Sequence, residues 1–436
     1  MLDTLKYDLV SATNKKLDII LNPSHPEHKE TLDEMGLIGK VVTWKEREYM
    51  VLKYDKQKLT PDTIETSGLF RSVIVNVGEK KIVSFSPPKA TAYQQYSHGE
   101  NIWPNTRIEQ LIEGTMINMF NVDGEWELAT RSLVGANGKF YNEGGKDTFR
   151  SMFLEAVRSC GPCGDEESLY SRLNPSYCYS FVFQHPDNQI VTAVDTPRLY
   201  LIRMYHIDGG NITEYQPSSP EMRDITHADD VVLTVESPMQ FTRYGPYDSL
   251  ETLKKFWSTL DHSHDIMGVT VVDHTRNIRS RLRNPSFEMV RHLRGNQPKL
   301  QYQYLALRKE GKVGQYLRYY KQASDQFATF REQLHNFTRT LHTSYLDCFV
   351  KKTQPLNEYS GQYKTHMYAL HGIYLQTLRE KKEYVSLAVV IDYVNNLPTP
   401  RLMFSLNWHP RLNAAKERQL DYQKDNSDSK EPTAEA

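Results

Sequence analysis

The sequence predicts an α+β protein in which a domain of antiparallel β-sheets is followed by an all-α domain. Residues 40–283 are dominated by short runs rich in β-branched and aromatic residues, separated by turn residues. Glycine-containing turns join two pairs of these runs into predicted hairpins. After about residue 298 the apolar residues recur at helical spacing instead.

The strands are expected in six runs, at 41–54, 71–86, 114–130, 177–194, 198–207 and 266–274. The hairpins lie at 75–85 and 119–128, where alternating apolar residues flank the turn. Two segments with helical spacing, Thr148–Val157 and Leu250–Leu260, are expected to cross over the sheet.

The helices of the second domain are expected at Tyr302–Leu307, Val313–Tyr320, Asp325–Leu346, Tyr363–Leu378 and Tyr384–Val394. The predicted domains are therefore 1–298 and 299–410. The remainder, 411–436, is charged and almost free of large apolar residues, which predicts a disordered tail.

Composition limits the function classes. The formal net charge is −1, so any nucleic-acid surface must be local. Four cysteines are too few for a disulfide scaffold, which favours an intracellular, cytoplasmic setting. No apolar run approaches the roughly 20 residues of a membrane span, so no membrane partner is expected. The sequence does not indicate the oligomeric state.

The stretch Ile112–Gly138 joins a Glu113-Gly114-Thr115 turn to two strands and then to Thr130-Arg131. It resembles the nucleotide-binding hairpin of the phage-type single-strand RNA ligases, which belong to the covalent nucleotidyltransferase superfamily. In these ligases a lysine opens the turn and attacks the α-phosphate of ATP. Leu111 stands at the lysine position here, and a leucine has no lone pair with which to attack.

The resemblance continues in order along the chain. The run Tyr179–Pro186 resembles the third motif of these ligases, with Val182 at the glutamate position. Met267-Gly268 resembles the Glu-Gly of the fourth motif, so a second carboxylate is absent. Arg281 and Arg283 match the Lys-x-Lys pair of the fifth motif.

Upstream of the turn, Phe70-Arg71 and SFSPPK (Ser84–Lys89) resemble the segments that precede the nucleophile. The strings SFSPPK, EGTMIN and SFVFQHP are also similar to a ligase-like branch found in large eukaryotic DNA viruses. That similarity implies a host-cytoplasm or virion setting.

The resemblance implies a nucleotidyltransferase fold of ATP-grasp-like antiparallel sheets with a helical domain after it. It implies ATP and Mg²⁺ as cofactors, and nucleotide and single-stranded RNA ends as partners. Lys89, the closest lysine upstream of the turn, is the candidate displaced nucleophile, and no metal ligands are predicted. Carried over by position, the candidate nucleotide-binding residues are Glu113, Gly114, Thr115, Arg131, Phe181, Gln184, Arg281 and Arg283.

Three other sequence patterns have a structural interpretation as well as a functional one. Arginines alternate at Arg279, Arg281 and Arg283, which predicts one strand side with three guanidinium groups, facing either phosphate or solvent. Cys160-Gly-Pro-Cys163 copies a redox tetrapeptide, but a helical run precedes it, so a loop is expected. Aromatic and basic residues interleave in the C-terminal helices, which is typical of core packing and also suits a stacking surface for RNA.

Two functions remain open from the sequence. The first is an RNA-ligase-like nucleotidyltransferase that binds a nucleotide and joins RNA ends with a non-standard nucleophile. The second is a catalytically inactive ligase-fold protein that binds RNA or has a structural role. The substitutions at Leu111, Val182 and Met267 favour the second, whereas the retained turn and arginines indicate a ligand pocket in either case.

Overall fold

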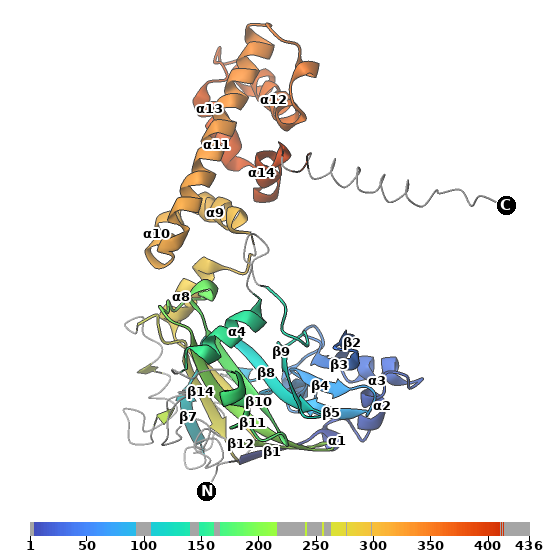
Figure 1. Ribbon diagram of the computed structural model, residues 1–436. Coiled ribbons are helices and arrows are strands. Elements are labelled where there is room, and N and C mark those ends of the chain that lie inside the picture. The colour runs from blue at the N-terminus through green and yellow to red at the C-terminus, as the bar shows by residue number, and fades with distance from the viewer. Residues whose placement is uncertain are drawn as a thin grey trace, which may run out of the picture. The chain divides into compact units, whose positions relative to one another are not determined.

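A computed structural model describes residues 4–92, 106–139, 148–160, 166–215, 240–241, 255–256, 263–275, 277–297, 299–409, 411 and 413. The chain divides into two compact units, Met1–Arg294 and Gly295–Ala436. The sheets lie in the first unit and the second is helical (Figure 1), which confirms the α+β prediction. The predicted tail and the helix at Leu250–Leu260 fall largely outside the described residues.

The described strands of unit 1 form three sheets. The six-stranded sheet has the order β1 (Thr4–Asp8), β12 (Asn211–Tyr215), β11 (Arg198–Asp208), β10 (Tyr177–Gln184), β8 (Thr115–Val122) and β9 (Glu125–Ala129). The five-stranded sheet has the order β13 (Gln240–Phe241), β7 (Thr106–Gln110), β14 (Gly268–Asp273), β15 (Ile278–Arg283) and β6 (Thr91–Ala92). The four-stranded sheet has the order β2 (Leu37–Trp44), β3 (Arg47–Tyr54), β4 (Val73–Asn76) and β5 (Lys81–Ser84). Among the described strand pairs all are antiparallel except β15 with β6.

Tight turns set the registers of the hairpins. Asp123 and Gly124 both have positive φ between β8 and β9, the conformation that a two-residue type I′ turn requires. Lys45 and Glu46, in the turn between β2 and β3, also both have positive φ, although neither is a glycine. Both hairpins predicted from the sequence, β4–β5 and β8–β9, are confirmed.

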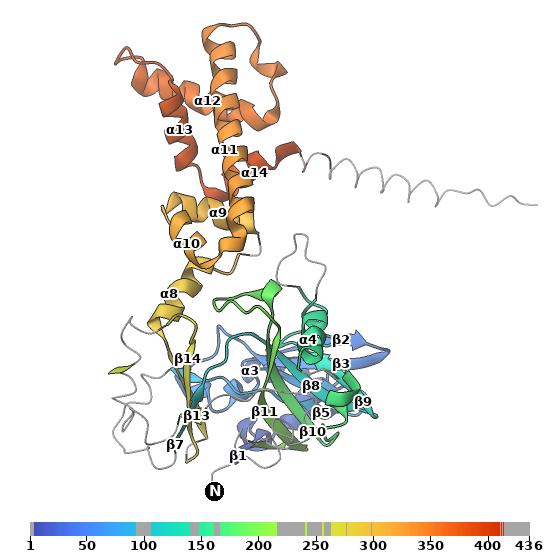
Figure 2. The same ribbon diagram turned by 60° about the vertical axis from the view of Figure 1, so that its left-hand side comes forward.

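The helices of unit 1 are α1 (Leu9–Ala12), α2 (Leu17–Leu21), α3 (His28–Glu34), α4 (Phe149–Arg158), α5 (Glu166–Tyr170) and α8 (Pro285–Arg294). Helix α4 confirms the prediction at Thr148–Val157, and Thr148 caps it by accepting from Ser151 N at 3.1 Å. Its apolar side lies on the six-stranded sheet (Figure 2), where the ring of Phe153 is 5.9 Å from that of Phe181. Short 3₁₀ turns occupy Pro61–Thr63, Ser67–Leu69 and Pro186–Asn188.

A buried ion-pair network joins two of the sheets. Arg203 on β11 is fully buried, and its Nε donates to Glu214 Oε1 on β12 at 2.8 Å. The same guanidinium pairs with Glu109 on β7, a strand of the five-stranded sheet. Tyr7 on β1 donates to the second oxygen of Glu214 at 3.1 Å. Burial opposes the charge of Arg203, but the two carboxylates outweigh it and raise its pKa.

Unit 2 consists of helices around α11. They are α9 (Leu300–Lys309), α10 (Val313–Tyr319), α11 (Ser324–Tyr345), α12 (Gly361–Ile373), α13 (Leu387–Asn396) and α14 (Thr399–Leu406). Single π-helical turns, Leu346–Val350 and Tyr374–Leu378, extend α11 and α12, and 3₁₀ turns occupy Lys321–Ala323 and Leu356–Glu358. Aromatic rings such as Tyr304 and Phe327, 5.1 Å apart, lie inside this unit, as core packing predicts. None of the described helices is long and apolar enough to cross a membrane.

The first prediction concerns the ion-pair network. Arg203→Met should lower the free energy of unfolding of the chain by about 3–5 kcal/mol, because it removes the buried guanidinium that neutralises the buried carboxylates of Glu109 and Glu214. Arg198→Met, at the exposed start of the same strand, is the matched control and should change it by less than about 0.5 kcal/mol. Chemical denaturation measures both. Equal stability of the two variants would contradict the assigned role.

Candidate functional site

One cavity in unit 1, of about 500 Å³, is almost entirely cationic, and we call it the arginine cavity. Its wall contains seven basic side chains: Lys56, Arg71, Lys89, Arg131, Arg281, Arg283 and Arg291. Tyr54, Ala90 and Thr91 complete the wall. Because the described residues that line the cavity include no carboxylate, its potential is strongly positive.

The basic side chains come from several elements of unit 1. Arg281 and Arg283 alternate along β15 and both line the arginine cavity. Arg279, the third member of the predicted alternating set, is not among the described lining of this cavity and lines a neighbouring one with Arg281. Arg131 follows β9, and its Nε donates to the carbonyl oxygen of Arg71 at 3.3 Å. The guanidinium of Arg131 also covers the ring of Tyr54, 5.0 Å from the ring centre.

Burial and the crowding of like charges lower the pKa values of two of these arginines. Burial, Arg71 and other neighbouring arginines lower the pKa of Arg281 to about 9. Burial and Arg131 lower that of Arg71 to about 10. Arg283 and Arg291 share Glu288, at 2.6 and 3.0 Å, so the repulsion is partly compensated there. A bound polyanion would relieve the repulsion that remains between Arg71 and Arg281.

Lys89 lies in the wall of the arginine cavity. The side chain is partly buried, and its Nζ donates to the carbonyl oxygen of Ala90 at 3.0 Å. Burial lowers the pKa of this lysine, and the nearby guanidinium groups, Arg281 foremost, lower it further. The neutral amine needed for nucleophilic attack is therefore easier to form here than on an exposed lysine.

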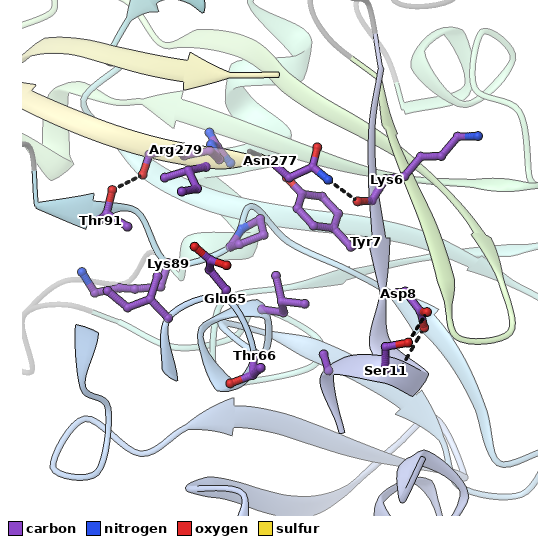
Figure 3. Close-up of a pocket in the computed structure, with 15 residues that line it drawn as sticks. Lys6, Tyr7, Asp8, Ser11, Glu65, Thr66, Lys89, Thr91, Asn277 and Arg279 are labelled. Carbon is purple, nitrogen blue, oxygen red and sulfur yellow. Dashed lines mark hydrogen bonds between the residues drawn. The ribbon is translucent and has the colours of Figure 1, made fainter. Parts of the chain in front are cut away.

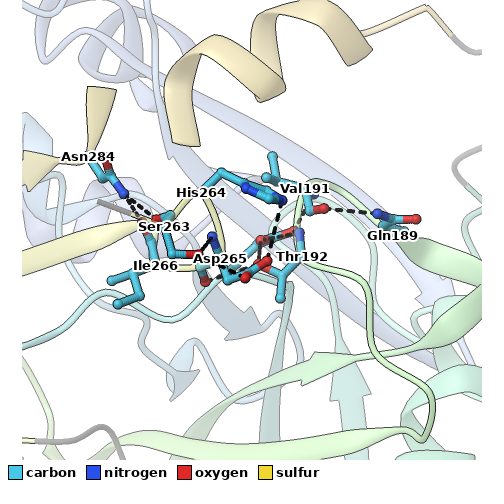
Figure 4. Close-up of polar contacts among 9 residues, drawn as sticks. Gln189, Val191, Thr192, Ser263, His264, Asp265, Ile266 and Asn284 are labelled. Atoms are coloured by element: carbon cyan, nitrogen blue, oxygen red, sulfur yellow. Dashed lines mark hydrogen bonds and ion pairs between the residues drawn. The ribbon is translucent and has the colours of Figure 1, made fainter. Parts of the chain in front are cut away.

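The Glu113 carboxylate has an internal structural role. It is buried and accepts hydrogen bonds from Val191 N at 2.6 Å, Thr192 N at 3.0 Å and Thr192 Oγ1 at 2.6 Å. Figure 4 shows Thr192 beside the segment that includes Asp265, whose carbonyl oxygen is 3.2 Å from the threonine hydroxyl. Both oxygens of Glu113 are thus occupied in holding two loops together.

The rest of the predicted turn is also engaged within the protein. Gly114 has φ +142°, and an added Cβ would lie 2.6 Å from Val182 Cγ1 and closer still to the carbonyl oxygen of Phe183, so only glycine fits. Thr115 Oγ1 accepts from Asn188 Nδ2 at 2.8 Å. Gln184 Nε2 donates to the carbonyl oxygen of Glu113 at 3.0 Å. None of these residues is among the described lining of the arginine cavity.

Phe181 requires a correction. Its side chain is fully buried and packs against Phe153 of α4, so it offers no stacking surface to a purine. The strand alternation that sends Phe181 and Phe183 toward α4 sends Val182 to the other side of β10. The sequence pattern does not reveal which side faces a ligand.

Val182 lines a small cavity beside the arginine cavity, and Leu111 lines it too. This space measures about 50 Å³, with Met116 and Ile202 in its apolar part and Arg281 shared with the larger cavity. It holds room for about one or two water molecules. Leu111 and Val182, which the sequence comparison with ligase motifs singled out, therefore add apolar side chains to a cavity next to the cations.

The structure adds residues to the predicted set. Arg131, Arg281, Arg283 and Lys89 meet in one cavity with Arg71, Arg291 and Lys56. Arg71 lies in the upstream Phe70-Arg71 segment that resembles the ligases. Arg291 follows the alternating arginines of β15 in a sequence segment, 276–294, that contains six arginines. Lys56 follows β3 as an ordinary loop lysine, and no sequence feature distinguishes it.

Two alternative sites receive no support. Among the described residues no group of three or more His, Cys, Asp or Glu side chains is placed to hold a metal. Cys160 follows the C-terminal end of α4, where its thiol donates to the carbonyl oxygen of Ala156 at 3.1 Å. A reactive thiol is favoured at a helix N-terminus instead, and Cys163 lies outside the described residues.

Comparison with known proteins gives a local similarity to an RNA ligase. The RNA ligase of Rhodothermus phage RM378 is 28% identical over 107 residues, which is 23% of this chain and 23% of the phage protein. The chain thus matches about a quarter of the length of that relative. No protein-family model matches the sequence.

Solved structures of ligases are also similar. A putative ATP-dependent DNA ligase from Aquifex aeolicus has a TM-score of 0.36 at 12% identity, covering 80% of this chain and 79% of the other. An archaeal ATP-dependent RNA ligase has a TM-score of 0.40 at 12% identity, covering 72% and 73%. TM-scores below 0.5 are too low to establish a shared fold.

The second prediction tests whether Glu113 stabilises the fold without contributing to ligand binding. Glu113→Gln should lower the free energy of unfolding by about 1.5–3 kcal/mol, because an amide replaces a charged acceptor of three hydrogen bonds. The affinity for tripolyphosphate should stay within about twofold of the original. Glu48→Gln, an exposed glutamate on β3, is the control. Lost tripolyphosphate binding at unchanged stability would instead place Glu113 in the ligand site.

Proposed function

We propose that this chain is an RNA-ligase-like protein that binds a nucleotide and RNA ends through phosphates held in the arginine cavity. The single observation that carries the proposal is the wall of seven cationic side chains without a carboxylate among the described lining residues. The local similarity to a phage RNA ligase supports the same ligand class.

Guanidinium groups suit this role because each offers a planar fork of donors that matches two phosphate oxygens. Arg71, Arg131 and Arg281 form ion pairs with no described carboxylate, so no described counter-ion competes with a ligand for their charges. Since the repulsion between them is present before binding, a triphosphate or a 5′-phosphorylated RNA end would be drawn in strongly. Binding should weaken as salt rises.

The residues do not fit a protein-held magnesium ion. Magnesium prefers oxygen ligands, usually carboxylates, whereas Val182 offers none and the described wall of the arginine cavity is cationic. The arginines can neutralise phosphate charge by themselves. ATP remains the proposed nucleotide, and any magnesium would arrive bound to its phosphates.

The geometry favours binding over the standard chemistry of the ligases that the chain resembles, because Leu111 and Val182 supply neither a nucleophile nor a carboxylate. Glu109, the carboxylate among the described residues of that wall, is paired with Arg203. Lys89 carries the second candidate function, nucleotidyl transfer. Its amine nitrogen would bond to the α-phosphorus of ATP, the bond to the bridging oxygen would break, and pyrophosphate would leave. The lowered pKa of Lys89 and its place among the arginines are the observations that favour this step.

The third prediction tests the arginine cavity as an anion site. Arg281→Met should weaken tripolyphosphate binding at least tenfold, because it removes a partly buried cation from the centre of the proposed phosphate site. Arg158→Met, an exposed arginine on α4, should leave the affinity unchanged. Isothermal titration calorimetry in EDTA measures both. Equal affinities, or binding that disappears in EDTA, would contradict the proposal.

The fourth prediction concerns Lys89. If it is a nucleophile, protein incubated with α-labelled ATP and magnesium should retain label through a denaturing gel, and Lys89→Arg should not. Labelling should reach its plateau at a lower pH than for an ordinary lysine, because the lowered pKa yields the neutral amine sooner. Lys56→Arg, in the same cavity, is the control. An unlabelled protein that still binds ATP would leave binding as the function, and label retained by Lys89→Arg would point to another nucleophile.

A further inference from the structure

A second cavity, of about 380 Å³, adjoins the arginine cavity and has a different character. Lys89 and Thr91 belong to the walls of both cavities, so the two meet at these residues (Figure 3). The volume lies within the range of small-molecule sites. The sequence patterns give no sign of it, because its wall combines the N-terminal strand, the loop before β4 and the start of β15.

A nucleotide bound by its phosphates needs a place for its base and ribose, and the arginine cavity and the small cavity at Leu111 and Val182 offer poor ones. The described wall of the arginine cavity has Tyr54 as its only aromatic ring, and Arg131 covers that ring. The small cavity at Leu111 and Val182, about 50 Å³, holds roughly one or two water molecules. Of these three cavities lined by described residues, the second cavity has a suitable size and adjoins the arginine cavity.

The chemistry of the second cavity suits a nucleoside. Ile64, Leu69, Pro88 and Ile278 supply apolar wall for the faces of a base. Figure 3 shows the Glu65 carboxylate turned into the cavity, between Lys89 and Tyr7. This exposed carboxylate can accept hydrogen bonds from ribose hydroxyls or from an amino group of the base.

Arg279 adds a buried polar group to the same wall. It is 7% exposed, and its Nε and Nη1 have no hydrogen-bond partner among the described residues. Unpaired donors inside a protein are normally met by water or by a ligand. Arg279 also lines the small cavity.

We propose that this second cavity, here called the nucleoside cavity, binds the base and ribose of a nucleotide whose phosphates occupy the arginine cavity. Lys89 lies at the junction, beside the phosphate closest to the ribose. This inference rests on the proposed function. The ligand is a nucleoside 5′-phosphate, supplied either by a free nucleotide or by the 5′-terminal nucleotide of an RNA.

The test compares ligands with and without a nucleoside. Titration calorimetry on the full chain would use tripolyphosphate, ATP, GTP and a 5′-phosphorylated RNA hexamer. ATP or GTP should bind at least tenfold more tightly than tripolyphosphate if the source is a free nucleotide. If the source is RNA, the 5′-phosphorylated hexamer should bind at least tenfold more tightly than tripolyphosphate. It should also bind at least tenfold more tightly than the same hexamer with a 5′-hydroxyl.

Two variants then test whether the additional affinity of the nucleoside-bearing ligand comes from the nucleoside cavity. Thr66→Trp fills the nucleoside cavity and should abolish the advantage of the nucleoside-bearing ligand while tripolyphosphate affinity stays within twofold. Thr66→Ala leaves the cavity open and is its control. Glu65→Gln should reduce the same advantage roughly tenfold, since it weakens a charged hydrogen bond. Glu48→Gln, elsewhere on unit 1, should reduce nothing. Melting temperatures confirm that each variant folds.

The outcomes separate the two proposals. If tripolyphosphate itself does not bind, the proposed function fails and this inference fails with it. If tripolyphosphate binds and the nucleoside adds no affinity, only the nucleoside cavity is refuted. If the Thr66→Trp variant keeps the higher affinity for the nucleoside-bearing ligand, the nucleoside cavity is also refuted. A purely electrostatic effect of Glu65→Gln would raise the affinity for all of these anions equally, which again contradicts a direct contact.

Discussion

The buried guanidinium of Arg203 is the interaction on which the arrangement of unit 1 depends. It binds Glu214 within the six-stranded sheet and Glu109 on β7 of the five-stranded sheet. A buried charge is tolerated only when it is paired, so the two sheets must meet where these three side chains coincide. Strand β14 separates β7 from β15, which carries Arg281 and Arg283. The network therefore fixes the position of the cationic strand relative to the rest of unit 1.

Neighbouring regions of unit 1 have different roles. The turn at Glu113 holds loops together, Leu111 and Val182 give apolar side chains to the small cavity, and seven basic side chains gather in the arginine cavity. The proposed phosphate site therefore lies apart from the Glu113 turn.

Local pattern was sufficient to predict much of the fold. Alternation and turn residues predicted the hairpins around Gly78 and Gly124, and helical spacing predicted α4 and most helices of unit 2. Alternation also predicted that Arg281 and Arg283 share a side of their strand. The pairing of β1 with β12 joins segments about two hundred residues apart, and no local pattern encodes such a contact.

The candidate site was predictable only in part, for a physical reason. A motif identifies residue types, but whether Glu113 faces a ligand depends on the loop at Val191 and Thr192, which supplies its hydrogen bonds. Phe181 faces α4 because of the packing of that helix, which the strand sequence does not specify. Lys56 belongs to the site through its position in space alone.

The most direct measurement is a crystal structure of the full chain with a non-hydrolysable ATP analogue. The account predicts electron density for the phosphates between Arg71, Arg131 and Arg281. Phosphates bound elsewhere on the chain, with the arginine cavity holding only water at saturating ligand, would contradict it.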